Sequence, residues 1–465
     1  MKSILYAAVF PAFLLLLSLS TVCSQTLDPA FPTVDGTVST LLVHGNTLYL
    51  GGSFTMVGGL PRTNIAAIDI PSKSVTSWAP HLNGDVVDID ARGGKVYFCG
   101  HFTQVDGASR NALAAVDSVS GAVDTFNPSI SFPGIPGMQT GTVASLKIAD
   151  NILYFAGYFL SVNGAARKNV AAIDLDLNQI TALNVSTDIP VNLIEMNGQA
   201  LYLGGPFYKV GGAERKGFAA VNRYSGALLQ WNPTVGNPGN TMYSILPSND
   251  QIFVGGFFWG LHGMDQCYLA NTDLSGTPTT WKPFNCGQPY AYVKSMLLVN
   301  DSLVLAGGDF ASFDGQSLKN LVLFHKTTGA INAWQPNPDG EVLALAGNDS
   351  LLFVAGKFLN IDGTSRQRLA VFHLPDAPTP TPEPDALAFT GFPNPANTDV
   401  SIVIPPDGVQ NVNVFDQNGA RMEVSYQIQD QLLTIQSASL LPGYYVVQMK
   451  TADGKKKAVP FLKLR

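Results

Sequence analysis

The fold follows from one short pattern: Val38-Ser-Thr-Leu-Leu-Val43, Leu48-Tyr-Leu-Gly-Gly-Ser-Phe54 and Asn64-Ile-Ala-Ala-Ile-Asp69. These runs are rich in β-branched, aromatic and leucine residues, and glycine and asparagine turns separate them. The pattern recurs up to about residue 374, with 48 to 57 residues between copies. The phenylalanine that closes the second run marks each copy, at Phe54, Phe102, Phe159, Phe207, Phe258, Phe310 and Phe358.

Each copy contains four strand-like runs, which lie at about 38–43, 47–54, 64–69 and 75–79 in the first copy. No segment of helical length shows apolar residues at the 3.6-residue spacing of a helix. A repeat of about 45–50 residues with four strands has the size of one β-propeller blade. A lone blade leaves both faces exposed, so the copies must stack. The sequence therefore predicts an all-β chain whose residues 25–374 form a seven-bladed β-propeller.

The two ends of the repeat region complement each other. Most copies end in an element such as Trp78-Ala-Pro80, but the seventh ends at Val371-Phe-His-Leu374 without one. A related run, Leu27-Asp-Pro-Ala-Phe-Pro32, stands near the start of the chain. We expect residues 27–32 to supply the last strand of blade seven and close the ring, because closure leaves only short sheet edges. The alternative is an open solenoid of seven units.

The first residues, 1–24, read as a signal peptide. Lys2 provides the positive n-region and Ile4 to Leu19 the apolar core, and small residues precede a cleavage site at Gln25. The alternatives are a transmembrane anchor, for which the run is too short, and a lipoprotein with Cys23 as the lipidated residue. No other apolar stretch is long enough to span a bilayer, so we expect no transmembrane segment in the mature protein.

The repeat resembles the delta-60 family of bacterial propeller repeats and, more loosely, a propeller region of fungal cell-surface polarity proteins. The resemblance covers most of residues 27–374. It rests on the Gly-x-Phe element, a glycine turn and an arginine that recurs at Arg62, Arg110, Arg167, Arg215 and Arg366. Copy five departs most, because Gln266 replaces the arginine and Gly260-Leu-His-Gly263 replaces the usual turn. This family implies a fold and not one activity.

The composition changes after Leu374. Residues 375–391 alternate proline with polar residues, which indicates an extended spacer. Residues 392–465 contain several short strand-like runs, typical of a small immunoglobulin-like β-sandwich.

This last region resembles the type A sorting domain of the type IX secretion system of Bacteroidetes. The resemblance rests on Phe392-Pro-Asn-Pro-Ala396, Val414-Phe-Asp-Gln-Asn-Gly419 and Leu441-Pro-Gly-Tyr-Tyr-Val446. The residues that carry it are Asn394, Pro395, Asp399, Gly419, Gly443 and Tyr445. It implies export through the periplasm, interaction with the type IX secretion machinery, and a final place that is extracellular or attached to the outer membrane surface. The alternative is an accessory sandwich that binds sugar.

Export implies an oxidising compartment, in which cysteines pair. Three cysteines follow the predicted cleavage site: Cys99, Cys267 and Cys286. Aligning blade five with blade one puts Cys267 at the start of the third strand and Cys286 just past the fourth, within disulfide reach. We predict a Cys267–Cys286 disulfide and a buried, unreactive thiol at Cys99.

Two polar positions recur around the predicted ring. The residue that closes the third strand is polar in every copy, and we expect it to bond its own hairpin turn rather than a ligand or metal. The recurrent arginine is expected to make a structural contact between blades rather than to hold anionic sugars. The strand-closing residues are Asp69, Asp117, Asp174, Asn222, Asp273, His325 and His373.

Residues that break the repeat are better indicators of a ligand, because a ligand is rarely sevenfold symmetric. In blade five, Phe257, Trp259 and His262 are weak ligand-binding candidates, since aromatic side chains stack on sugars or apolar partners. The insertion before blade three, Phe132 to Met138, is another. Local core filling is the alternative for both.

Charge and missing motifs narrow the function. The net charge of −7 provides no reason to expect nucleic acid, which needs a basic face. The sequence has no Gly-x-Ser-x-Gly, His-Glu-x-x-His or phosphate-loop motif, so we predict no catalytic residue, metal site or cofactor. It favours a monomeric, secreted or cell-surface binding module for a glycan, matrix or protein partner. The alternative is a secreted polysaccharide lyase or hydrolase with a site on one propeller face.

Overall fold

The computed structural model contains two compact units, Met1–Pro375 and Asp376–Arg465. The residues that it describes are 25–133, 142–236, 241–286, 291–374, 391–392, 399–404, 408–416, 421–429, 431–451 and 456–463. Every regular element in this described part is a β-strand, which confirms the predicted all-β class. Among these same residues, no helix is long and apolar enough to cross a membrane.

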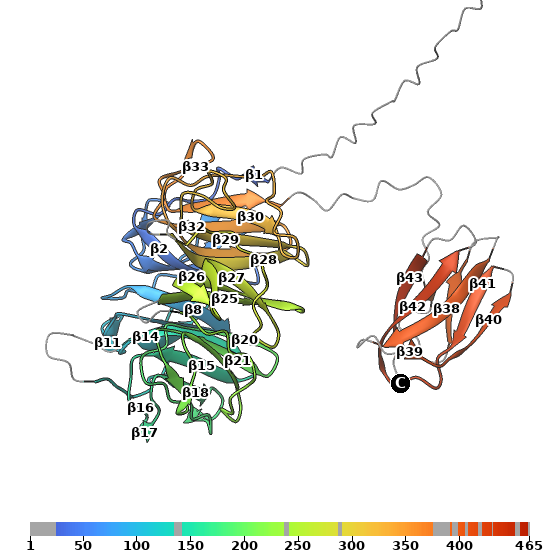
Figure 1. Cartoon of the computed structure of the whole chain (residues 1–465), viewed down its shortest axis with the longest axis horizontal. Coiled ribbons are helices and arrows are strands. Elements are labelled where there is room, and N and C mark those ends of the chain that lie inside the picture. Colours follow the sequence, from blue (N-terminus) through green and yellow to red (C-terminus); the bar gives the residue numbers. More distant parts are fainter. Residues whose placement is uncertain are drawn as a thin grey trace, which may run out of the picture. The chain divides into compact units, whose positions relative to one another are not determined.

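The first unit is built from antiparallel sheets (Figure 1). Over its described residues, seven of these sheets contain a first, a second and a third strand from one copy of the repeat, and we number these seven in chain order; the unit also has smaller sheets of two or three short strands. In each of the seven, the second strand pairs with the first and with the third, because each copy of the repeat folds back on itself twice. The first strands are β2 (Thr37–His44), β8 (Val86–Arg92), β14 (Val143–Ala149), β20 (Leu193–Asn197), β25 (Thr241–Pro247), β28 (Tyr292–Asn300) and β31 (Val342–Gly347).

The second and third strands form the middle of each sheet and are almost wholly buried. The second strands are β3 (Thr47–Ser53), β9 (Lys95–Gly100), β15 (Ile152–Gly157), β21 (Ala200–Gly204), β26 (Gln251–Leu261), β29 (Leu303–Asp309) and β32 (Leu351–Gly356). The third strands are β6 (Ile65–Asp69), β12 (Leu113–Asp117), β18 (Val170–Asp174), β24 (Phe218–Asn222), β27 (Met264–Asp273), β30 (Leu321–His325) and β35 (Leu369–His373). Their apolar runs without polar alternation suit strands that are covered on both faces.

The fourth strand of each sheet is at most two residues long among the described residues. It is β7 (Ser74–Val75) in sheet one and β19 (Gln179–Ile180) in sheet three. Sheets two, four, five and six carry a single bridge there instead, such as Val116 to Val123.

The first strands follow one another around a closed ring. Each packs against the next along the chain, and β31 of sheet seven packs against β2 of sheet one. In Figure 1 the blue β2 accordingly lies beside the orange β32.

The N-terminal segment completes sheet seven. Its strand β1 (Thr26–Leu27) pairs with β35 through Thr26–His373 and Leu27–Phe372. The expected strand over 27–32 is therefore shorter and starts one residue earlier. Pro29 and Pro32 have no backbone N–H for a ladder, so the segment beyond Leu27 is held by other contacts.

The phenylalanines that define the repeat lie between neighbouring sheets. Each of the seven, from Phe54 to Phe358, is at most 3% exposed. Truncating a buried phenylalanine to alanine typically costs about 3–5 kcal/mol, so these positions hold the stacked sheets together.

The second unit consists of two four-stranded sheets that share one core. Their strand orders are β36-β37-β41-β40 and β39-β38-β42-β43. Val400 and Ile435 on the first sheet and Val447 and Phe461 on the second belong to the same buried cluster. The strands are β36 (Gly391–Phe392), β37 (Asp399–Val403), β38 (Val409–Asp416), β39 (Arg421–Met422), β40 (Ser425–Gln429), β41 (Leu432–Gln436), β42 (Gly443–Thr451) and β43 (Lys456–Lys463).

Candidate functional site

A β-bulge recurs in the first strand of six sheets. In sheet one, Val38 pairs with Gly52 and Thr40 with Gly51, so Ser39 is left without a partner in the ladder. A bulge breaks the alternation of the strand and re-aims the side chain at that position. The bulged residues are Ser39, Val87, Ala144, Tyr243, Lys294 and Leu343.

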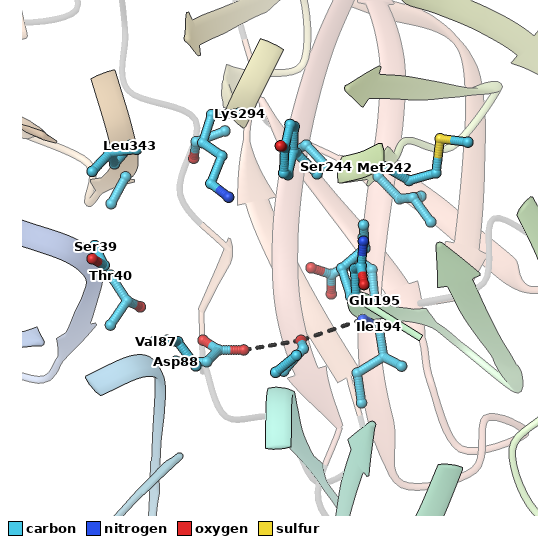
Figure 2. Close-up of a pocket in the computed structure, with 18 of the residues that line it drawn as sticks. Ser39, Thr40, Val87, Asp88, Ile194, Glu195, Met242, Ser244, Lys294 and Leu343 are labelled. Carbon is cyan, nitrogen blue, oxygen red and sulfur yellow. Dashed lines mark hydrogen bonds between the residues drawn. The ribbon is translucent and has the colours of Figure 1, made fainter. Parts of the chain in front are cut away.

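These six residues, together with Asn192 of sheet four, line one cavity of about 450 Å³. All seven first strands contribute to its wall, so it lies at the centre of the ring (Figure 2). Polar side chains, among them Ser39, Thr40, Asn192 and Ser244, line one part of the wall, and apolar ones such as Leu345 line another. The volume falls within the range of small-molecule sites, about 300–1,000 Å³.

Sheets two, three and four contribute three charged side chains to the cavity wall: Asp88, Lys147 and Glu195. Lys147 Nζ lies 3.1 Å from Glu195 Oε2. The carboxylate of Glu195 raises the pKa of Lys147, and Asp88 and Asp90 add to this effect. Both aspartates have raised pKa values because they are buried.

The two aspartates are also tied into the wall by hydrogen bonds. Asp88 accepts from Ser145 Oγ at 3.0 Å and from the Leu146 N–H at 2.9 Å. The Ser145 oxygen in turn accepts from the Ile194 N–H at 3.2 Å, so the chain of bonds crosses three sheets (Figure 2). Asp90 accepts from the Ile148 N–H at 2.7 Å. These carboxylates therefore join neighbouring first strands.

A second group of polar side chains lies where sheets five, six and seven meet the channel. Lys294 Nζ sits 3.9 Å from the centre of the Tyr243 ring, and Figure 2 shows the ammonium directed into the cavity. Burial lowers the pKa of Lys294. The Tyr292 hydroxyl donates to Glu341 Oε1 at 2.7 Å, and Lys357 pairs with Glu341 at 2.8 Å.

Sequence reasoning missed this whole set of channel residues. One signal was present: the position after the apolar residue that opens each first strand differs in every copy, although the rest of the repeat is regular. Tyr243 and Lys294 stand at that position in copies five and six.

The strand-closing polar residues make hairpin turns. Asp117 accepts from the Ser120 N–H at 2.7 Å, and His325 Nδ1 accepts from the Thr327 N–H at 3.2 Å. His373 differs, since its Nε2 lies 2.8 Å from Asp28 Oδ2. His325 and His373 thus have separate partners.

The recurrent arginines do not join one blade to the next, so that expectation is wrong. Arg110 donates to the Asp124 carbonyl at 2.6 Å and Arg167 to the Thr181 carbonyl at 2.9 Å, each within its own copy. The fourth run lies alongside the third in the same sheet, and its carbonyls are the nearest acceptors. Arg366 follows the same rule, because its acceptor, the Phe31 carbonyl at 2.9 Å, belongs to the segment that completes sheet seven.

The blade-five candidates lie on a long hairpin, β26 and β27, and none of them lines the cavity. Phe257 and Trp259 come together, with ring centres 6.0 Å apart. Trp259 is 47% exposed and its Nε1 donates to the Tyr268 hydroxyl at 3.0 Å. His262 is exposed in the hairpin turn between β26 and β27.

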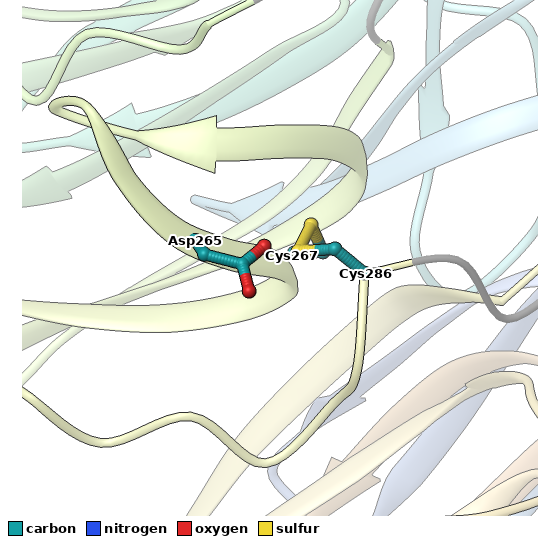
Figure 3. A group of neighbouring side chains, drawn as sticks. All are labelled: Asp265, Cys267 and Cys286. Carbon is teal, nitrogen blue, oxygen red and sulfur yellow. A yellow bond between two sulfur atoms is a disulfide. The ribbon is translucent and has the colours of Figure 1, made fainter.

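The fifth copy of the repeat also contains the predicted disulfide between Cys267 and Cys286, whose Cα atoms are 5.4 Å apart (Figure 3). The Asp265 carboxylate lies beside the two sulfurs. Metals bind thiolates, which disulfide sulfurs are not, and Asp265 already pairs with Lys282. Cys99 is a buried free thiol, and burial raises its pKa well above the usual value.

The other predicted positions are only partly described. Phe132 packs against the buried cluster of sheet three, while 134–138 of the insertion lie outside the described residues. Asn394, Pro395 and Gly419 also lie outside them. Asp399 begins β37 and Gly443 begins β42. Tyr445 is 5% exposed, its ring stacks on Phe461 with centres 5.5 Å apart, and its hydroxyl donates to the Leu441 carbonyl at 2.8 Å.

Solved structures resemble the chain only weakly. The computationally designed Ika8 protein is 13% identical, with a TM-score of 0.42, over 73% of this chain and 98% of that one. BamB from Moraxella catarrhalis is 14% identical, with a TM-score of 0.29, over 72% and 68%. Such scores establish no shared function. The chain has no match among curated proteins.

Residues 390–459 match the family described as a secretion system C-terminal sorting domain. The matched segment covers nearly all of the described second unit, including the two sheets and their common core. The C-terminal part of this chain is therefore a type IX secretion sorting domain that interacts with the type IX machinery, and it supports export of the protein to the cell surface or the extracellular space.

Proposed function

We propose that residues 25–374 form a seven-bladed β-propeller of delta-60-type repeats that acts as an exported binding module for glycans. We further propose that the ligand enters the central cavity. The observation that carries this proposal is the cavity itself: about 450 Å³ in volume and lined by side chains from all seven first strands.

The chemistry of the cavity wall supports a hydroxylated ligand. Ser39, Thr40, Ser244 and Asn192 line it, and within the described residues their side chains have no hydrogen-bond partner in the protein. Free hydroxyl and amide groups both donate and accept, as sugar hydroxyls require. Tyr243 adds an aromatic surface of the kind on which sugar rings pack.

A hydrolase is less well supported. Glycoside hydrolysis needs two carboxyl groups aimed at one bond. Asp88 and Glu195 line the cavity. Asp88, like the nearby Asp90, accepts a hydrogen bond from a neighbouring strand, and Glu195 pairs with Lys147. Each carboxylate thus already has a partner within the wall.

A lyase is the second candidate function. Such an enzyme removes a proton next to a carboxylate with a base whose pKa lies near the working pH. Burial lowers the pKa of Lys294, which is the direction a lysine base requires. We regard binding as the better proposal because Tyr292, the nearby acid, holds its proton against Glu341, and burial raises its pKa.

The test is a glycan array on the full chain, followed by product analysis on every glycan that binds. Binding without product is the expected result and contradicts both enzymatic alternatives. An unsaturated product, detected by ultraviolet absorbance, contradicts a pure binding role. If no glycan binds, the glycan-binding proposal is wrong, and surface-protein or matrix partners take its place.

The sorting domain supports further proposals about the source, the processing and the oligomeric state of the protein. We propose that its source is a member of the Bacteroidetes, that residues 1–24 are removed on passage into the periplasm, and that the mature protein is monomeric. A mass spectrum of the secreted protein tests the cleavage, with Gln25 expected as its first residue.

A further inference from the structure

We propose that the central cavity selects an acidic sugar, whose carboxylate pairs with the Lys294 ammonium. This inference rests on the proposed glycan-binding function and adds to it the charge of the ligand and the residue that reads it.

Among the described residues that line the cavity, Lys294 is the cation without an ion-pair partner. Lys147 pairs with Glu195 at 3.1 Å, Lys357 with Glu341 at 2.8 Å, and His101 Nδ1 lies 3.1 Å from Asp85 Oδ2. Lys294 has no carboxylate within ion-pair distance among the described residues, and its one recorded contact is the Tyr243 ring at 3.9 Å. The protein thus leaves one positive charge in this cavity for a ligand to neutralise.

The backbone at Lys294 also directs its side chain into the cavity. Lys294 is the bulged residue of β28, so its side chain leaves the regular alternation of the strand. Figure 2 shows its ammonium in the space between Leu343, Ser244 and Asp88. Lys294 is partly buried. An ammonium that is partly removed from water without a partner is unfavourable, and a bound anion would relieve that cost.

Two charged groups near Lys294, Glu341 and Lys357, act on its ammonium. Burial lowers its pKa, Glu341 opposes this shift, and Lys357 adds to it. Glu341 is already engaged by Lys357 and by the Tyr292 hydroxyl. Glu341 therefore acts on Lys294 through its charge alone and forms no ion pair with it among the described residues.

The rest of the wall favours a sugar acid over a simple inorganic anion. A phosphate or sulfate site needs several donors that converge on one point, whereas Lys294 is a single point charge. The hydroxyl and amide groups of Ser39, Thr40, Asn192 and Ser244 are spread over sheets one, four and five. This arrangement suits a ring that carries one carboxylate and several hydroxyl groups.

A matched pair of ligands tests the charge without changing the protein. Titration of the full chain with glucuronate and with glucose, and with galacturonate and galactose, should show binding of the acids at least tenfold tighter than of the neutral sugars. Equal affinity for acid and neutral sugar would overturn this inference and leave the glycan-binding proposal intact. Binding of inorganic phosphate as tight as that of the acids would also overturn it.

Variants then assign the charge to Lys294. Lys294→Gln should weaken uronate binding at least tenfold and remove the preference for the acid over the matching neutral sugar. Lys282→Gln, which removes a lysine outside the cavity, should change neither. An unchanged uronate affinity in a folded Lys294→Gln protein would overturn the assignment.

The pH dependence provides a readout that does not depend on folding of the glutamine variant. Uronate binding by the natural protein should fall as pH rises through the lowered pKa of Lys294, before an exposed lysine at about 10.4 would lose its proton. Lys294→Arg stays charged over this range and should lose that fall. A uronate affinity that is flat up to pH 10 in the natural protein would contradict the proposal.

Discussion

Glycine and tryptophan meet where one sheet packs on the next. Trp78 Nε1 donates to the Asp117 carbonyl of sheet two at 2.9 Å, and Gly121 of the same turn faces Trp78. The same arrangement places Gly329, at φ +71°, directly against the Trp281 indole. A glycine is needed there for two reasons: the left-handed backbone and the missing Cβ.

Gly329→Ala should destabilise the protein more than Gly363→Ala. Both glycines have a positive φ, +71° and +68°, but a Cβ at Gly363 meets nothing within 4 Å. The control should lose about 1–2 kcal/mol from backbone strain alone, and Gly329→Ala about 1–3 kcal/mol more from the clash with Trp281. Urea unfolding followed by circular dichroism measures the difference. Equal losses would show that the indole moves aside freely.

Asparagine also links neighbouring sheets. Asn320, at φ +62°, accepts from the Phe310 N–H at 3.0 Å and donates to the Pro338 carbonyl, next to sheet seven, at 3.0 Å. Asn64 does the same between sheets one and two, with the Gly84 carbonyl as its acceptor at 2.8 Å. Gly217 stands at the equivalent position of sheet four.

Asn320→Gly separates these hydrogen bonds from the backbone conformation. Glycine keeps the left-handed φ, so the loss should reflect the unpaired groups alone, about 1–3 kcal/mol. Asn320→Ala should lose about 1–2 kcal/mol more through strain. Thermal and urea unfolding of both variants provide the comparison. A glycine variant as stable as the natural protein would mean that water replaces both bonds.

The N-terminal segment that completes sheet seven is held largely by one carboxylate. Asp28 is 4% exposed and accepts from Lys73 Nζ at 2.7 Å and from the Ala30 N–H at 3.0 Å, while His373 Nε2 lies 2.8 Å away. Lys73 belongs to sheet one and His373 to sheet seven, so Asp28 joins the two ends of the ring. Burial acts to raise the pKa of Asp28, but Lys73, the Ala30 amide and His373 outweigh it, and the pKa is lowered.

Asp28→Asn should lower stability at neutral pH by about 1–3 kcal/mol, because charged hydrogen bonds are lost. The folded pKa lies below the unfolded value of about 3.9, so the carboxylate stabilises the fold above that pH and less as pH falls through the folded pKa. The difference between natural protein and variant should therefore shrink between about pH 5 and pH 2. Unfolding measured across this range tests the prediction.

Asp265→Asn is the control, because Asp265 belongs to an exposed ion pair with Lys282. It should change stability by less than about 1 kcal/mol. A similar loss in both variants would contradict the special role of Asp28.

At the level of the whole molecule, the proposed binding cavity and the sorting domain belong to separate units. The first unit has its own buried clusters between successive sheets, and the second has one core of its own. Their stabilities should therefore be independent.

A chain that ends at Leu374 should keep the thermal unfolding transition of the first unit and lose secretion. Tyr445→Ala in the full chain should also reduce secretion, because it removes the buried ring that stacks on Phe461. Cell fractionation and immunoblotting of the growth medium measure both. A truncated chain secreted as well as the full one would show that the sorting domain is dispensable.

The sequence predicted the elements of the fold well. The runs expected at 38–43, 47–54 and 64–69 are β2, β3 and β6, and the fourth run is short because only Ser74 and Val75 pair. The position of the buried phenylalanines follows directly from their recurrence. The contact of the recurrent arginines was predicted wrongly. Arg110 reaches the carbonyl of Asp124, fourteen residues later in its own copy. The repeat pattern does not show whether an arginine contacts its own copy or the next one.

Local pattern alone was enough to determine the strands, the export signal at the C-terminus and the all-β class, because hydrophobic periodicity, turn residues and short motifs are properties of neighbouring residues. The cavity needed the tertiary structure. Tyr243, Lys294 and Asp88 come from three copies of the repeat, and no spacing in the sequence brings them together. The bulge in six of the seven first strands re-aims a side chain toward the cavity, and closure of the ring places these side chains around one space. Whether each charge has a partner there depends on the distances across that space, which is why Lys294 stands out only in the folded molecule.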